Sequence, residues 1–474
     1  MSIDRRKFLL QCSMGAMGLT GMGWANGSSL SADKIGARLA AASGKTRAKK
    51  VIYLHMSGGP PGLDIFDYKP DLVKYDRTPC PKEFIEGKRL AFIKGHPVLL
   101  GPPHKFKQVG QNGTWVTELM PNFEKIVDDV CMIHSMHTDQ FNHAPAELLL
   151  HTGTQVFGGA SLGSWALHGL GTMNADLPGF VVMLSGPSDP TGGKSLWGSA
   201  YLPSHLQGTL MRAKGDPILY VSNPAGMDRA GRRSSLDALA KLNKLEHHRS
   251  GSPDTLSRSE QYELAYRMQS SVPDAMDINQ ESAQTIEDYG AKPGEASFAN
   301  NCLLARRLVE RDVRFVQLYD WGWDIHGTST GDDLIDSFPK KCMEIDRPIA
   351  ALIQDLKKRG LLDETLVVWG GEFGRTPMNE ARGGSIKLGR DHHPDCFTLW
   401  MAGGGVKPGL HFGETDELGY SITKDPVSVR DLQATILHIL GLDPFQLKWP
   451  HLGLDQRLIG PDDAAAKIRP ELLA

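Results

Sequence analysis

Short apolar runs recur along the chain without alternating with polar residues, and most of them end at a glycine or a charged residue. A run of this kind, bounded by turn residues, predicts a strand that is buried on both faces of a sheet. Six stretches fit this description: residues 51–56, 130–136, 180–184, 313–318, 365–369 and 396–401.

Between these runs, apolar residues return every three to four positions, which is the period of an amphipathic helix. The pattern predicts helices at residues 116–127, 146–150, 229–249, 256–268, 298–310, 348–359 and 431–440, and another that opens at 161–165. Alternation of buried strands and helices predicts an α/β fold, a mixed, mostly parallel sheet sandwiched by helices. Residues 185–223 are rich in Gly, Pro and Ser without periodicity, so we expect a lid or rim loop there.

Charged and imidazole side chains gather just after four of the predicted strands. An open α/β sheet binds its ligands outside the carboxyl ends of its strands. We therefore expect these side chains to converge at one edge of the sheet. The residues are Asp64 and Asp67; His143; Asp320, Asp324 and His326; and Glu372, Asp391, His392 and His393.

Carboxylate oxygen and imidazole nitrogen together suit zinc, manganese or iron, and mixed sets recur in two-metal hydrolases. We expect one metal on Asp324, His326 and either His392 or His393, with Asp391 beside them. Asp320 competes with Asp324 for the same role. A second position would be bordered by Glu372, Asp64 and His143.

Arg375 follows Glu372 closely and carries a fork of donors suited to an anionic oxygen. Each of these groups of candidate residues also has an explanation that involves no ligand. Asp324 and His326 can form a simple turn, residues 391–393 a surface loop, and Glu372 a salt bridge with Arg375.

Composition narrows the class of protein only slightly. The chain has 474 residues, 40% hydrophobic and 23% charged, and a formal net charge of −3. These values describe a globular protein and give no electrostatic case for binding nucleic acid. Cys12 lies in the N-terminal segment, and the other five cysteines show no paired spacing, so buried free thiols are expected, with one disulfide left open.

The N-terminus has the pattern of a targeting segment. Arg5-Arg6-Lys7-Phe8-Leu9 is a twin-arginine pattern, and a glycine-rich, weakly apolar stretch follows it to Trp24. We predict a signal peptide at 1–25, a linker at 26–50, the twin-arginine translocase as a partner and a periplasmic location. The stretch is too short for a membrane span. The alternative is a chance arginine pair ahead of a polar tail.

Six motifs follow one another along the chain. They are Asp64-x-Phe66-Asp67, Asn142-His143-x-Pro145-Ala146, Ser161-x-Gly163-Ser164-Trp165, Gly322-Trp323-Asp324-x-His326-Gly327, Gly371-Glu372-Phe373-Gly374-Arg375-Thr376-Pro377 and Gly389-Arg390-Asp391-His392. Together they resemble the exported bacterial domain-of-unknown-function family fifteen-oh-one, often labelled sulfatase-like. The resemblance covers residues 50–442.

That family is placed in the alkaline-phosphatase and sulfatase superfamily. The resemblance implies an alkaline-phosphatase-like domain at 51–460 with a loop insertion near 185–295, a tail at 461–474, and a two-metal site at the carboxyl edge of the sheet. It also implies a divalent cofactor, with zinc first and manganese, calcium or iron as alternatives. The implied substrate is an anionic ester or a sulfated glycan.

One departure from the sulfatase pattern affects the expected chemistry. His143 stands at the nucleophile position and Glu147 at the arginine position, and no formylglycine can form from histidine. Direct attack by a metal-activated water, His143 as ligand or nucleophile, and binding without turnover all remain open. The expected function is an exported metal-dependent hydrolase of phosphate or sulfate esters. The alternatives are a metal-stabilised binding protein and a metal-using oxidoreductase.

Overall fold

The computed structural model describes residues 47–88, 90–219, 222–252, 254–462 and 465–474. The predicted signal peptide at 1–25 and nearly all of the predicted linker lie outside these residues, so both stay predictions. Within the described part of the chain, no helix has both the length and the apolar character needed to cross a membrane.

The core of the molecule is a nine-stranded sheet in the order β13-β5-β12-β9-β1-β8-β6-β7, with β16 beside β5. Among its described strands, β12 alone runs antiparallel to its neighbours, β5 and β9. The expected mixed, mostly parallel sheet is therefore confirmed. Its strands are β1 Lys50–Ser57, β5 Val130–His137, β6 Phe180–Ser185, β7 Thr209–Leu210, β8 Phe315–Trp321, β9 Thr365–Gly370, β12 Phe397–Ala402, β13 His411–Phe412 and β16 Val427–Ser428.

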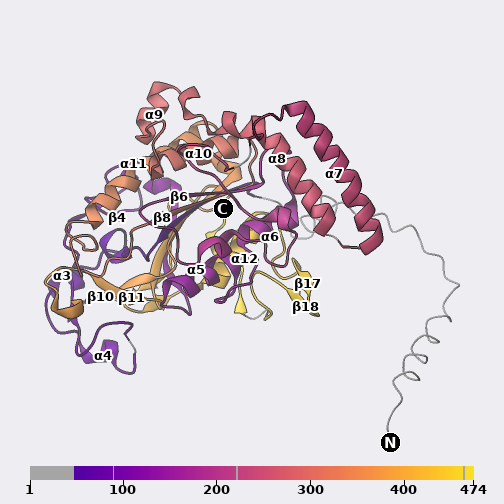
Figure 1. The fold of residues 1–474 in the computed structure, drawn as a ribbon. Coiled ribbons are helices and arrows are strands. Elements are labelled where there is room, and N and C mark those ends of the chain that lie inside the picture. The colour runs from indigo at the N-terminus through magenta and orange to yellow at the C-terminus, as the bar shows by residue number, and fades with distance from the viewer. Residues whose placement is uncertain (1–46, 89, 220–221, 253, 463–464) are drawn as a thin grey trace, which may run out of the picture.

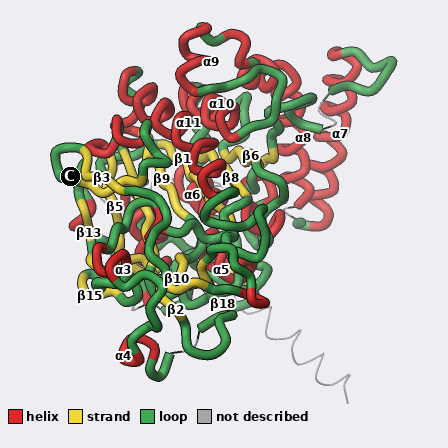
Figure 2. The backbone as a smooth tube through the Cα atoms, turned by 90° about the vertical axis from the view of Figure 1, so that its left-hand side faces the viewer, coloured by secondary structure: helices red, strands yellow, loops and turns green. Residues whose placement is uncertain are grey.

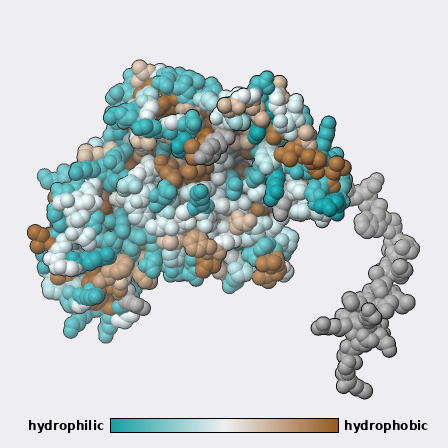
Figure 3. Space-filling view, in the orientation of Figure 1, coloured by the Kyte–Doolittle hydropathy of each residue, from teal (hydrophilic) through white to brown (hydrophobic). Residues whose placement is uncertain are grey.

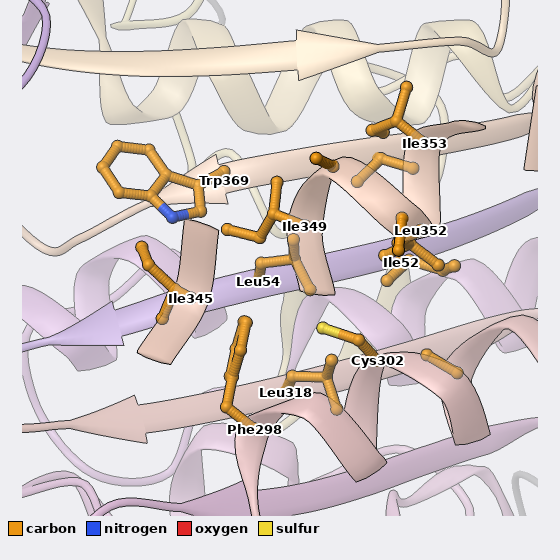
Figure 4. Close-up of a cluster of buried hydrophobic side chains, with 14 of the residues drawn as sticks. Ile52, Leu54, Phe298, Cys302, Leu318, Ile345, Ile349, Leu352, Ile353 and Trp369 are labelled. Carbon is orange, nitrogen blue, oxygen red and sulfur yellow. The ribbon is translucent and has the colours of Figure 1, made fainter. Parts of the chain in front are cut away.

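Helices cover both faces of this sheet (Figure 1). On one side lie α9 Ala283–Tyr289, α10 Phe298–Glu310 and α11 Phe338–Lys358; on the other lie α5 His143–Thr152, α6 Leu162–Leu170 and α12 Val429–Ile439. Strand β1 alternates between the two layers: Ile52 and Leu54 pack against the layer of Phe298 and Ile349 (Figure 4), whereas Tyr53 faces the opposite layer. The three-layer arrangement is thus confirmed.

Two long helices, α7 Arg229–Ser250 and α8 Asp254–Met276, form a hairpin that projects from the side of the molecule (Figure 1). The apolar side chains Leu242 and Leu245 are 62% and 67% exposed on α7. Hydrophobic colour on this projection is visible in Figure 3. Both helices were predicted from the sequence, α7 almost at full length and α8 only over residues 256–268.

The predicted helix at 116–127 is wrong. Residues of β4 Thr114–Thr117 pair instead with β3 Phe106–Val109, and only the short turns η2 Phe123–Lys125 and η3 Val127–Asp129 follow. Two physical features explain the error. The β-branched residues of β4 favour an extended chain, and Pro121 cannot donate a helical hydrogen bond. Helix α11 also begins ten residues before the predicted start at 348.

The stretch after Glu372 contributes to a second, small sheet, which the apolar pattern did not predict. Its strands are β10 Gly374–Asn379, β11 Arg390–His393 and β2 Val98–Leu99 (Figure 2). The antiparallel register sets Arg375 opposite His392, and this pairing carries His392 to the site described next.

The other described elements are short. They are η1 Gly62–Asp64, α3 Pro70–Lys74, α4 Lys82–Ile85, η4 Gly193–Trp197, η5 Ser204–Leu206, η6 Ile278–Gln280, η7 Leu362–Glu364, η8 Arg382–Gly384, β14 Glu414–Thr415, β15 Ile422–Lys424, β17 Trp449–His451, β18 Leu454–Gln456 and η10 Pro470–Leu472.

Candidate metal centre

Three imidazoles converge on one oxygen of Asp324, and we call these four residues the rim cluster. The Oδ1 atom of Asp324 lies 2.7 Å from Nε2 of His326, and 3.2 Å from Nε2 of both His143 and His392. All four donor atoms lie within 4.8 Å of one another. Ligands of a tetrahedral zinc at about 2.0–2.1 Å are separated by about 3.3 Å, so the spacing fits a single metal ion.

The opposite ring nitrogen of each imidazole is held in place. Nδ1 of His143 lies 2.5 Å from a carboxylate oxygen of Glu372, and Nδ1 of His392 lies 2.6 Å from the Phe141 carbonyl oxygen. Nδ1 of His326 is hydrogen-bonded to Glu380. A proton on Nδ1 leaves the lone pair of Nε2 directed at the cluster, which is how metal-ligating histidines are usually oriented.

Local sequence features explain how these side chains reach one place. His143 is the first residue of α5, with Asn142 extended at the N-cap, and the helix ends at Gly153. Gly58, with φ +117°, lies in the turn after β1, and a Cβ there would lie 2.5 Å from the backbone nitrogen of Asp324. A glycine at position 58 therefore lets the two loops that follow β1 and β8 touch.

Burial, the neighbouring imidazoles and Arg375 set the pKa values of the rim cluster. Burial raises the pKa of Asp324, but its close contacts with the three imidazoles and the charge of Arg375 hold this pKa well below its usual range. Burial and Arg375 lower the pKa of His392 to about 4, so its ring is neutral. Burial lowers the pKa of His143, but its bonds to Asp324 and Glu372 outweigh that effect and raise it to about 9.

The rim cluster is partly open to solvent and has aromatic walls. The Asp324 side chain is 28% exposed. The Phe92 ring lies 5.1 Å from that of His392, and Trp321 lies 5.7 Å from His143, both edge-on. An external molecule can therefore approach the cluster past apolar surfaces.

Arg375 does not have the role expected for it. Its side chain is fully buried, and its donors already reach the Gly59, Arg390 and Gly58 carbonyls as well as Asp324, the last at 2.6 Å. These bonds use four of the five N–H donors of the guanidinium, and a fully buried group presents no fork of donors to a substrate anion. Arg375 instead fixes Asp324 and makes the site more positive.

Three predicted metal ligands lie outside the rim cluster with partners of their own. Asp64 forms a fully buried two-pronged ion pair with Arg390, at 2.6 and 2.9 Å. Asp391 accepts the backbone N–H groups of Phe92 and Ile93, and His393 bonds the Tyr420 carbonyl oxygen at 2.7 Å. None of the three belongs to a group of potential metal ligands among the described residues, so we leave them out of the ligand set that we propose below.

Asp320 is also excluded as a competitor for Asp324. Its carboxylate is paired with Lys341 at 2.7 Å and accepts a hydrogen bond from Ser185. The five described cysteines are buried and free, as predicted, and none of them belongs to a group of potential metal ligands.

Glu372, the remaining predicted ligand, joins the rim cluster to a second group that sequence reasoning missed. With His55 of β1 and Glu147 of α5 it forms an interior cluster, and all three side chains are fully buried. Glu380, which orients His326, was also missed. The available signals were Tyr53, His55 and Ser57 at spacing two on a strand, and His143, Glu147 and His151 at spacing four on a helix.

Fold and site together define an α/β protein with potential metal ligands at the carboxyl edge of its sheet. Residues 48–469 match the model of the family described as "Protein of unknown function (DUF1501)", so the chain belongs to that family, as the sequence motifs suggested. No curated protein matches the chain.

The chain is also loosely similar to solved structures. PsFucS1 sulfatase from Pseudoalteromonas sp. is 13% identical over 87% of this chain and 72% of that one, with a TM-score of 0.35. Alkaline phosphatase from the Antarctic bacterium TAB5 is 10% identical over 84% of this chain and 99% of that one, with a TM-score of 0.34. Phosphonate monoester hydrolase SpPMH from Silicibacter pomeroyi is 11% identical over 86% of this chain and 76% of that one, with a TM-score of 0.34. Scores of this size carry no inference about the present chain.

Proposed function

We propose that this protein is a metal-dependent hydrolase of phosphate or sulfate esters that works at the rim cluster. One observation carries the proposal: three imidazoles, each anchored through Nδ1, direct Nε2 at the same carboxylate oxygen of Asp324. That arrangement has no value for a packed core, where a buried charge is costly. It is the usual construction of a metal site.

The donor set favours zinc. Three imidazole nitrogens and one carboxylate oxygen suit zinc, iron or manganese, whereas calcium prefers oxygen ligands alone. When bound, such an ion lowers the pKa of a coordinated water and neutralises anionic ester oxygens. These are the two requirements of ester hydrolysis in a chain with no serine or cysteine at position 143.

The residues of the chain have distinct proposed roles. His143, Asp324, His326 and His392 hold the ion. Arg375, fixed at Asp324, adds a positive charge that favours anionic substrates without touching them. Glu380 keeps the His326 ring in its orientation. A formylglycine nucleophile has no part in this scheme.

Export by the twin-arginine route to the periplasm is part of the same proposal, because the Arg5-Arg6 pattern supports it. Detection of the mature protein in periplasmic fractions, and its loss when both arginines are replaced by lysine, would test this. The alkaline-phosphatase-like domain at 51–460, the insertion near 185–295 and the tail at 461–474 are likewise proposed boundaries.

Two neighbouring histidines provide a matched test of the proposed reaction. The purified protein is assayed on aryl sulfates and aryl phosphates with added zinc or manganese. We expect His392→Gln to abolish turnover and reduce bound metal, and His393→Gln to keep both, because His393 is held by Tyr420. Equal effects of the two substitutions, or full turnover in metal-free protein, would refute the proposal.

A second candidate function is a metal-stabilised binding protein for sulfated glycans. The burial of Arg375 favours it, because a fully buried guanidinium with four of its five donors bonded to the protein is poorly placed to orient a reacting ester. Glycan binding with a bound metal but no turnover on any ester of the panel would support this function.

A further inference from the structure

Helix α5 presents a polar stripe to the sheet where its neighbours present apolar side chains. His143, Glu147 and His151 are spaced by four residues and lie on one face of the helix. The facing strand β1 contributes Tyr53 and His55, which alternate with apolar residues of the opposite core. Ring contacts of 5.1 Å between Tyr53 and His151, and 4.6 Å between His55 and His151, show that helix and strand meet here.

The interior cluster lies within this polar layer. Nε2 of His55 is 3.6 Å from Oε1 of Glu147 and 3.5 Å from Oε2 of Glu372. Both distances exceed a good N–H···O hydrogen bond, and the three donor atoms lie within 4.8 Å of one another. The side chains are 0% exposed, so bulk water cannot compensate for the two carboxylates.

Several atoms of the cluster lack partners. Among the described residues, three atoms of the cluster have no hydrogen-bond partner: Nδ1 of His55, Nε2 of His55 and Oε1 of Glu147. Unpaired buried polar groups are rare in native proteins and mark something unaccounted for. A water or an ion between the three side chains would satisfy the two atoms that face the other members, Nε2 of His55 and Oε1 of Glu147.

Both carboxylates of the interior cluster are held by hydrogen bonds from residues outside the cluster. The other oxygen of Glu147 accepts from the Thr191 hydroxyl and from the Gly192 N–H, each at 2.7 Å. Glu372 accepts from the Gly58 N–H at 2.9 Å and contacts His143 at 2.5 Å. Each carboxylate is thus oriented from behind and turns an oxygen towards His55, as metal-ligating carboxylates are.

We propose that the interior cluster binds a second divalent metal ion, held by His55, Glu147 and Glu372. Three donors with these spacings leave a point about 2.0–2.4 Å from each of them, which spans the ligand distances of zinc, magnesium and calcium. Two carboxylates and one imidazole form a harder donor set than the rim cluster, so Mn²⁺ competes better here. Because the site is closed, this ion is structural and does not meet substrate.

This inference does not depend on the proposed function. The full chain is loaded with Mn²⁺ or Zn²⁺, freed of excess metal, and its metal content is measured by mass spectrometry. We expect two ions per wild-type chain, and one each in Glu147→Gln and His326→Gln. Asp346→Asn is the matched control and is expected to keep two ions. Asp346 is also a buried carboxylate, and it accepts hydrogen bonds from the backbone and side-chain amides of Asn122 and from the Phe123 N–H.

The outcomes separate the two sites. One ion that Glu147→Gln removes but His326→Gln leaves supports the interior site and contradicts the rim site. One ion with the opposite dependence overturns the interior site, and its atoms are then satisfied by water. Should Glu147→Gln not fold, His326→Gln decides, because it lacks a rim ligand and keeps the whole interior cluster. One ion bound per chain of this variant supports the interior site, and a folded variant without bound metal overturns it.

Discussion

The rim cluster and the interior cluster are built at the same edge of the sheet, yet they differ in donors and in access. The rim cluster has three imidazoles and one carboxylate, and Asp324 is 28% exposed. The interior cluster has one imidazole and two carboxylates, all fully buried. Glu372 touches His143 of the first and His55 of the second. The comparison teaches that composition and access differ together: the imidazole-rich set lies where solvent reaches its carboxylate, and the carboxylate-rich set is enclosed.

The largest effect is expected from breaking the rim cluster. His326→Ala removes one of its imidazoles, and loss of metal chemistry costs several kcal/mol of transition-state stabilisation. A loss of about 4 kcal/mol corresponds to about 10³-fold in rate. Steady-state turnover of an aryl phosphate or sulfate, with circular dichroism as the control for folding, measures this. Unchanged turnover in a folded variant would remove His326 from the mechanism.

The next effect distinguishes a structural arginine from a substrate clamp. Arg375→Met removes the guanidinium that pairs with the Asp324 carboxylate and donates to three buried carbonyls. Breaking a buried ion pair on one side costs about 3–5 kcal/mol, so we expect a large fall in the free energy of unfolding in urea. A variant with normal stability and only a raised KM would show that Arg375 binds substrate after all.

Asp64→Asn tests whether the acid discarded from the ligand set is purely structural. The substitution breaks the buried pair with Arg390, and we expect a loss of about 3 kcal/mol of stability with no change in metal content. Metal analysis at a temperature where the variant is folded gives the answer. A fall in bound metal would return Asp64 to the site.

Glu380→Gln should produce a smaller effect that falls on the rim cluster alone. Glu380 does not face the ion but fixes the His326 ring, and loss of such an outer partner typically costs 10–100-fold in metal affinity. Competition with a fluorescent zinc chelator measures the change. Glu344→Gln is the control, because that carboxylate pairs only with Lys341 at the surface. Equal affinities in both variants would contradict the role given to Glu380.

The smallest effect belongs to the projecting hairpin of α7 and α8. Leu242 is 62% exposed there, and surface substitutions of this kind change stability by less than about 0.5 kcal/mol. We expect Leu242→Gln to leave the melting temperature, the metal content and turnover unchanged. A change in metal content would mean that the hairpin communicates with the clusters.

Much of the fold follows from local pattern. All six apolar runs became strands of the main sheet, and helix α10 Phe298–Glu310 matches its predicted span. Strands β10 and β11 were not foreseen, because they are extended only through pairing with each other and β2. Such pairing is set by context more than by intrinsic preference.

All four residues of the rim cluster were among the predicted candidates, but the sequence could not narrow the candidates to these four. The strand-end rule selected His143, Asp324, His326 and His392. It also selected Asp64 and Asp391, which other groups engage. The rule places a residue at an edge and says nothing of the direction in which its side chain points. His55 was missed because it lies inside a run that was interpreted as an apolar strand, and Glu147 because it lies inside a predicted helix. The spacing of apolar residues predicts strands and helices, but it does not show which buried polar residues are functional.

The most direct test is an anomalous difference map at the zinc edge from crystals of the full chain loaded with Zn²⁺. The account predicts a peak bounded by Oδ1 of Asp324 and Nε2 of His143, His326 and His392, at about 2.0–2.2 Å from each. A map without a peak at these four atoms, from crystals grown at saturating zinc, would contradict it.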